Sequence, residues 1–218
     1  MKFLCALFIR PYRIEQLQDL DLLTEFADYY RSLPMVSNSL YAALLHDPGF
    51  VKIIPDNAAK IIPLAIKLRN FALYNDCIIH LLGPWRRPRF TLLEDKELKK
   101  LVVNAYAKLA LQVSRVDAEV SLYFCRFRDH RQFRDEAETL AINSMSESFI
   151  SQPLYYHNLY TCTLFNQNLY EAIAPILKDN LMLVRRESST GHNLYDDFFL
   201  CAEIEAEDLP WDITEFDW

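Results

Sequence analysis

Residues 23–45 read LTEFADYYRSLPMVSNSLYAALL, with apolar side chains recurring every three or four positions on both sides of Pro34. This spacing predicts one helix over residues 19–31 and a second over residues 35–46. The proline separates the two helices because its ring removes a backbone donor, and the turn HDPG at residues 46–49 closes the second. The side chains expected to face the core are Leu20, Leu23, Phe26, Ala27 and Tyr30 in the first helix and Val36, Leu40, Ala43 and Leu44 in the second.

The rest of the chain continues this helical pattern. Only three of its 218 residues are glycine, far below the average usage of roughly 7%. Strands, hairpins and phosphate-binding loops all depend on glycine, so its scarcity favours helices and excludes the nucleotide-binding motifs GxGxxG and GxxxxGK[ST]. The sequence therefore predicts an all-α fold, an irregular multi-helix bundle.

Helical spacing places several further elements along the chain. The longest helix is expected over residues 94–124 as the central helix of the bundle, and Thr91 and Glu94 have the spacing of a capping box at its start. A fourth helix is expected to be capped by Asp56–Asn57 and to be kinked or restarted at Pro63. The other expected helices cover residues 2–9, 72–82, 130–142 and 168–178, and residues 143–153 are expected to form the least ordered link.

The two ends of the chain differ in charge. All 23 Lys and Arg lie before Glu187, together with 20 of the 30 Asp and Glu, whereas the last 32 residues hold ten Asp and Glu and no Lys or Arg. This acidic end is too rich in apolar side chains for a disordered tail, and Leu200–Glu205 alternates apolar with acidic residues, as an extended segment with one buried face would. We therefore predict an extended acidic C-terminal arm, docked on the basic body from Asp196 to Trp218. Its anchoring side chains are expected to be Phe198, Phe199, Leu200, Ile204, Leu209, Trp211, Phe216 and Trp218.

The five cysteines are odd in number, far apart and mostly flanked by apolar residues, which is typical of buried free thiols. We therefore expect an intracellular protein of a reducing compartment, the cytoplasm or the nucleus. The apolar start of the chain is interrupted by Arg10 and lacks the cleavage site of a signal peptide. No apolar run approaches the roughly 20 residues of a membrane span, so we expect no membrane association.

Two side-chain pairs could bind a metal. Cys77 and His80 lie three positions apart on one helical face, and Cys125 and His130 are the nearest candidates for a second pair. Because the two spacings do not match, we interpret these residues as core residues and expect no metal. Asp196–Asp197 resembles the aspartate pairs that hold magnesium and diphosphate in helical prenyl-transfer enzymes, but the further acid that such a site needs is replaced by a leucine. We expect no catalytic residue and no cofactor.

The arginines gather in two stretches, residues 86–89 and residues 126–136. The second interleaves four arginines with two phenylalanines, as a nucleic-acid surface could. Its own acids neutralise it, and phosphate binding needs an uncompensated basic surface. We therefore expect these stretches to dock the acidic arm, and consider nucleic acid an unlikely partner.

Residues 3–34, FLCALFIRPYRIEQLQDLDLLTEFADYYRSLP, resemble the second half of a BTB/POZ domain. In that family a helix ending in a short Y-x-G-x-Y-like turn precedes a helix carrying L-x-x-L-A-D-Y-Y. Here Phe8–Tyr12 corresponds to the turn and Leu23–Tyr30 to the second helix, with Phe26 where a leucine is usual. Residues 57–85 and 195–212 are similar to BTB/POZ-domain proteins of filamentous fungi.

The resemblance implies three regions: residues 1–46 as the second half of a BTB/POZ domain, 47–186 as a helical C-terminal domain, and 187–218 as the acidic aromatic arm. It implies a chain that begins after the strands and usual dimer surface of such a domain. The implied function is that of a non-enzymatic protein–protein interaction or adaptor module, in ubiquitin-ligase recruitment or transcriptional regulation; a small helical enzyme or ligand-binding bundle is the alternative. Self-association through the exposed apolar residues of the first helix is also expected. The candidate partner-binding residues are Phe8, Tyr12, Asp28, Tyr29, Tyr30, Leu33 and Trp211.

Overall fold

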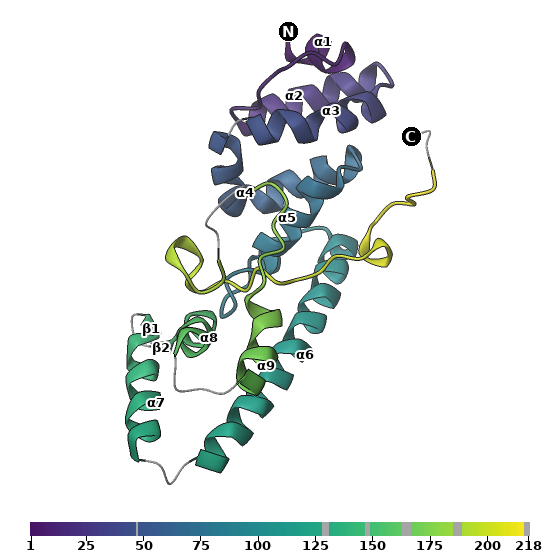
Figure 1. Ribbon diagram of the computed structural model, residues 1–218. Helices are drawn as coiled ribbons and strands as arrows, with labels where there is room; N and C mark the ends of the chain where they lie inside the picture. Colours follow the sequence, from purple (N-terminus) through teal and green to yellow (C-terminus); the bar gives the residue numbers. More distant parts are fainter. Residues whose placement is uncertain (47, 128–130, 147–148, 163–166, 185–188, 216–218) are drawn as a thin grey trace.

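The elements follow one another along an elongated stack of helices (Figure 1). The structure, a computed structural model, describes residues 1–46, 48–127, 131–146, 149–162, 167–184 and 189–215. Its α-helices are α1 (Lys2–Leu7), α2 (Leu17–Tyr29), α3 (Leu33–His46), α4 (Pro48–Lys67), α5 (Phe71–Leu82), α6 (Lys96–Phe127), α7 (Arg131–Asn143), α8 (Gln152–Thr161) and α9 (Gln167–Leu177). The strands β1 (Met145–Ser146) and β2 (Phe149–Ile150) form one short hairpin, and the 3-10 turns are η1 (Arg89–Leu92), η2 (Asn193–Tyr195) and η3 (Ala206–Asp208). The predicted all-α multi-helix fold is confirmed.

Helices α1, α2 and α3 pack together at one end of the stack, where α2 and α3 also contact α4 (Figure 1). The apolar face predicted for α3 is buried throughout. In α2, Leu20, Leu23 and Ala27 are buried as predicted, but Phe26 and Tyr30 are 48% and 60% exposed. The predicted inward orientation of these two side chains is wrong, because the neighbouring helices cover only one edge of the apolar stripe on α2.

Helix α4 begins earlier than the sequence predicts and runs continuously through Pro55 and Pro63. The expected cap at Asp56–Asn57 is wrong: Asp56 forms an ion pair with Arg89 at 3.1 Å, and the Asn57 side chain donates to a carbonyl one turn earlier in the same helix. A buried stripe continues across both prolines, so packing maintains the helix although each proline removes one helical hydrogen bond. The stripe consists of Phe50, Val51, Ile54, Ala58, Ile61, Ile62 and Ala65.

Helix α5 lies at the centre of the core, with every side chain from Ala72 to Leu82 buried. Its start is capped by Asn70, whose Oδ1 accepts a hydrogen bond from the Leu73 amide at 3.0 Å. Gly83 follows its last turn, and a side chain there would collide with the Phe198 ring of the C-terminal arm, 2.3 Å from the position of a Cβ. The absence of a side chain at Gly83 therefore lets the arm approach the end of α5.

The long predicted helix is confirmed as α6, which passes α5 at one end and α9 further along (Figure 1). Its buried residues recur at every third or fourth position from Leu98 to Val120, whereas Leu101, which was also expected to face the core, is half-buried. The predicted capping box is wrong, because Asp95 caps the helix by accepting from the amides of Glu97 and Leu98 at 2.9 and 3.0 Å. Thr91 instead lies in the preceding turn η1.

The segment expected to be the least ordered link, residues 143–153, contains the hairpin β1–β2 and the start of α8. Ser151 caps α8 through its hydroxyl. Helix α8 was not predicted, because its buried residues, Pro153, Tyr156 and Leu159, do not form an alternating three-and-four stripe. Helices α7 and α9 occur within one residue of their predicted bounds.

The C-terminal segment runs back from α9 across α5 and α6 (Figure 1). Phe199, Leu200, Cys201 and Ala202 are buried, and the Phe199 ring lies edge-on against Trp85 with a centroid separation of 5.1 Å. The predicted docking of the arm is therefore confirmed for its described residues, whereas Phe216 and Trp218 lie outside them. The predicted alternation is correct only in its second half, because Leu200 to Ala202 are all buried.

Candidate protein-interaction surfaces

A cluster of exposed apolar side chains lies on α1 and α2 at one end of the stack. We define the aromatic face as the exposed side chains Met1, Leu22, Phe26, Tyr29 and Tyr30 together with the partly buried Phe3. The Phe3 ring joins the two helices, because it lies 5.9 Å from the Phe26 ring and 5.4 Å from the Tyr30 ring. Tyr29 is 80% exposed and packs edge-on against Tyr30. The face is therefore continuous and open to solvent.

The predicted partner-binding residues do not form one site. Tyr29 and Tyr30 belong to the aromatic face, and Phe8 is exposed at the end of α1. Tyr12 and Leu33 are buried, and the Tyr12 hydroxyl shares a hydrogen bond with Ser39 at 2.9 Å. Tyr12 therefore contributes to a surface only as part of the lining of a pocket beside Pro11 and Ser39. The two other candidates are engaged elsewhere: Asp28 pairs with Lys67 on α4, and Trp211 packs on Tyr74 of α5.

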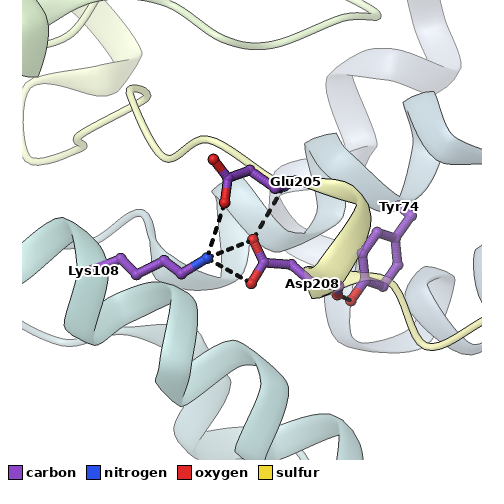
Figure 2. Close-up of polar contacts among 4 residues, drawn as sticks. All are labelled: Tyr74, Lys108, Glu205 and Asp208. Carbon is purple, nitrogen blue, oxygen red and sulfur yellow. Dashed lines mark hydrogen bonds and ion pairs between the residues drawn. The ribbon is translucent and has the colours of Figure 1, made fainter.

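The C-terminal arm forms a second surface where it crosses α6 (Figure 2). The ammonium of Lys108 lies 2.9 and 3.0 Å from the two carboxylate oxygens of Asp208 and 3.5 Å from Glu205. The Asp208 carboxylate also accepts the Glu205 amide, and its backbone carbonyl accepts the Tyr74 hydroxyl at 3.1 Å. Hydrogen bonding to Asp208 raises the pKa of Lys108, and burial raises the pKa of Tyr74. Both groups therefore keep their protons at neutral pH and serve as donors to the arm.

The same surface extends along the arm to the loop between α4 and α5. Trp211 lies edge-on against Tyr74, with ring centroids 5.1 Å apart. Arg69 binds the arm three times, through the carbonyls of Asp212 and Glu215 at 3.4 and 3.3 Å and the Glu215 carboxylate at 2.6 Å. A groove of about 450 Å³ remains between Arg69, Phe71 and the arm.

Sequence reasoning missed Arg69, Tyr74 and Lys108 as the residues that hold the arm. It assigned that role to the arginine stretches, and this is correct only for Arg89, whose guanidinium lies over the Phe198 ring of the arm at 5.9 Å while also pairing with Asp56. The Arg86 guanidinium instead lies over the Phe149 ring at 3.8 Å. Part of the second stretch, residues 128–130, lies outside the described residues. One local signal was present on the arm: Glu205-x-x-Asp208 has the spacing of the capping box that forms there. No local pattern marks Lys108 among the other lysines of α6.

The four residues considered as metal ligands have different surroundings. Cys77 and His80 are both buried in α5, as the core interpretation expects, whereas Cys125 is exposed and His130 lies outside the described residues. Over the described ranges, no three His, Cys, Asp or Glu side chains gather as metal ligands. Asp196 and Asp197 contribute backbone carbonyls to packing, accepting from the Ser151 hydroxyl and the Trp85 amide at 2.6 and 3.0 Å.

A buried polar pair lies beneath the arm on α5. The Asp76 carboxylate accepts the amides of Met182 and Leu183 at 2.7 and 2.9 Å, which fixes the chain just after α9. Burial raises the pKa of Asp76 to about 6. Burial, and then the positive charge of Arg89, lower the pKa of His80 to about 4, and no hydrogen-bond partner of its Nδ1 is described. Asp76 therefore holds the segment after α9, whereas the His80 ring packs against the Tyr195 and Phe198 rings, with centroid separations of 5.9 and 6.4 Å.

Comparison with known proteins identifies no family, since no family model, curated protein or solved structure matches this chain. The BTB/POZ resemblance therefore stays a prediction that rests on residues 3–34 and the two similar stretches. Among the helices that the structure describes, none has the length and apolar character needed to cross a membrane.

Proposed function

We propose that the chain is a non-enzymatic protein–protein interaction module that binds a partner through the aromatic face of α1 and α2. The observation that carries this proposal is the exposure of large apolar side chains on one continuous face, with Tyr29 80% and Tyr30 60% exposed. Exposed apolar clusters of this kind mark interaction sites in proteins.

The chemistry of the face suits a protein partner. Tyrosine and phenylalanine bury roughly 150–250 Å² each when covered, and tyrosine is enriched among the residues that dominate binding energy. Lys2 and Asp19 form an ion pair of 2.7 Å beside Phe3, and the groove there is lined by Met1, Leu22 and Phe26. An apolar centre with charged groups at its edge is the usual arrangement of a protein interface.

The predicted adaptor role and compartment belong to the same proposal. The BTB/POZ-like spacing of the first two helices supports an adaptor, with ubiquitin-ligase recruitment or transcriptional regulation as the implied settings. All five cysteines are free thiols, which supports a reducing compartment such as the cytoplasm or the nucleus.

The test compares partners captured by three forms of the chain. Tyr29→Lys places a charge at the centre of the aromatic face, whereas Leu194→Lys changes a side chain that is 88% exposed in turn η2 and serves as the matched control. Cross-linking followed by mass spectrometry should identify proteins that bind the wild type and Leu194→Lys but not Tyr29→Lys. Sedimentation of the three forms reports whether the bound partner is a second copy. Equal capture by Tyr29→Lys and the wild type would refute the proposal.

A further inference from the structure

The C-terminal arm consists of two halves that are held in different ways. The inner half, residues 198–202, is buried from Phe199 to Ala202, and its main chain is bound into the fold. The Leu200 amide donates to Thr190 at 3.2 Å, and the Leu200 carbonyl accepts the Asn180 amide at 3.0 Å. The inner half is therefore part of the core.

The outer half, residues 203–215, lies on the surface. Ile213 is 58% exposed, while Leu209 and Trp211 are only half-buried. Its described contacts with α5, α6 and the loop before α5 come mainly from three side chains, Arg69, Tyr74 and Lys108. In each of the two ion pairs one partner is about half exposed, Glu215 at 54% and Lys108 at 51%. Pairs that are open to solvent in this way contribute little to stability, so the outer half can open without unfolding the inner half.

The outer half also carries local structure of its own. The Asp208 carboxylate accepts the Glu205 amide at 3.1 Å, and the Asp212 carboxylate accepts the Thr214 amide at 2.8 Å. Pro210 fixes one backbone angle between these two turns. The segment is therefore ordered by its own sequence into the form of a peptide ligand, which lowers the entropy lost on docking.

The surface under the outer half recognises a definite chemistry. Lys108 binds the carboxylates of Glu205 and Asp208, which lie three residues apart. Tyr74 binds the Asp208 carbonyl and the Trp211 ring. Arg69 binds the Glu215 carboxylate and the carbonyls of Asp212 and Glu215. The groove of about 450 Å³ beside Arg69 is lined mainly by the arm itself, with Arg69 and Phe71 as its other lining residues.

We infer that the surface of Arg69, Tyr74 and Lys108 is a docking site for acidic, tryptophan-containing peptide segments of partner proteins, and that the outer half of the arm occupies it as an intramolecular competitor. The recognised pattern places two carboxylates, a tryptophan and a further carboxylate at the spacing of Glu205, Asp208, Trp211 and Glu215. This site is separate from the aromatic face, so the inference does not depend on the proposed function.

Competition within the chain sets the size of the measurable effect. A tethered segment acts at an effective concentration in the millimolar range. A peptide added in trans is bound only by the fraction of molecules whose arm is open, so its apparent affinity falls in proportion to that fraction. Opening the arm should therefore tighten binding of an external peptide.

The experiment uses a fluorescent peptide with the sequence of residues 203–215 and measures its anisotropy against the full chain. In the variant Asp208→Ala/Trp211→Ala the arm loses the Asp208–Lys108 ion pair and the Trp211–Tyr74 ring contact, so the peptide should bind roughly tenfold more tightly than to the wild type. Adding Lys108→Glu to this variant should abolish the gain, because the surface itself then repels the carboxylates. A peptide carrying the same two alanine replacements is the matched control and should not bind.

A milder variant keeps the test decisive where the double variant fails to fold. The Glu205 side chain is 63% exposed and bonds to Lys108, so Glu205→Gln should fold normally and tighten peptide binding about two- to threefold. Equal peptide affinity in the wild type and in the folded arm variants would overturn the inference. Binding that survives Lys108→Glu would also overturn it, because the peptide would then be using another surface.

Discussion

The pH dependence of stability should reveal two buried groups whose effects oppose each other. In the folded chain the pKa of Asp76 is about 6, above its ordinary 3.8, and the pKa of His80 is about 4, below its ordinary 6.5. The contribution of Asp76 to the free energy of unfolding is complete below pH 3.8, its ordinary pKa. This contribution is lost as pH rises through the folded-state pKa of about 6. The His80 contribution is complete above pH 6.5 and is lost as pH falls toward the folded value.

The magnitudes follow from the size of these differences. Each is about two pKa units, and one unit corresponds to about 1.4 kcal/mol, so each group changes the free energy of unfolding by about 3 kcal/mol across its window. Because the windows overlap between about pH 4 and pH 6, the two slopes nearly cancel in the wild type. The free energy of unfolding of the wild type therefore changes little with pH, although each group alone would change it strongly.

Substitution of either group should expose the other. We expect His80→Phe, measured relative to the wild type, to gain about 3 kcal/mol as pH falls from 6.5 to 4, because only the wild type must keep a buried histidine neutral there. Asp76→Asn should show the opposite difference, gaining about 3 kcal/mol as pH rises from 4 to 6. Urea unfolding followed by tryptophan fluorescence at half-unit pH steps provides the curves. A difference curve that is flat for either variant would refute the assignment of that group as buried and shifted.

Three further perturbations test the packing. Trp211→Ala removes the edge-on contact with Tyr74. Because the indole is only half-buried, the loss of stability should be about 1–2 kcal/mol, which lowers the melting temperature by a few degrees. An unchanged melting curve would contradict this contact. Gly191→Ala should lower the free energy of unfolding in urea by about 2 kcal/mol, because φ is +70° and a Cβ would lie 2.4 Å from the Pro153 carbonyl oxygen. Full stability of this variant would show that the backbone at Gly191 has another conformation. Phe8 is 71% exposed, so the wild type should self-associate in sedimentation and Phe8→Lys should reduce it; a monomer at high concentration in both forms excludes this role.

The helices could be predicted wherever the apolar spacing is regular. Val36, Leu40 and Leu44 were expected to face the core and are fully buried, and the stripe on α6 holds for about six turns. The scarcity of glycine pointed in the same direction. These signals are local, because each depends only on residues within a few positions of one another.

Local rules failed where tertiary packing competes with them. Pro55 and Pro63 should interrupt α4, but its buried stripe packs against α5 and keeps the helix continuous. Phe26 and Tyr30 belong to an apolar stripe, yet they stay 48% and 60% exposed because the Phe3 ring of α1 covers only part of each ring. Helix α8 has too weak a periodicity to be recognised, and its place depends on packing against α7 and α9.

The sequence by itself determined that this chain is helical and that its acidic end must dock, since periodicity, glycine content and aromatic content are properties of the chain alone. Only the tertiary structure decided that Asp208 meets Lys108 and Trp211 meets Tyr74, across separations of 100 residues or more. It also decided that Tyr29 and Tyr30 remain exposed while Tyr12 is buried. The physical reason is that helix formation depends on near neighbours, whereas the pairing of distant side chains depends on how the helices share one core and on which faces that core leaves uncovered.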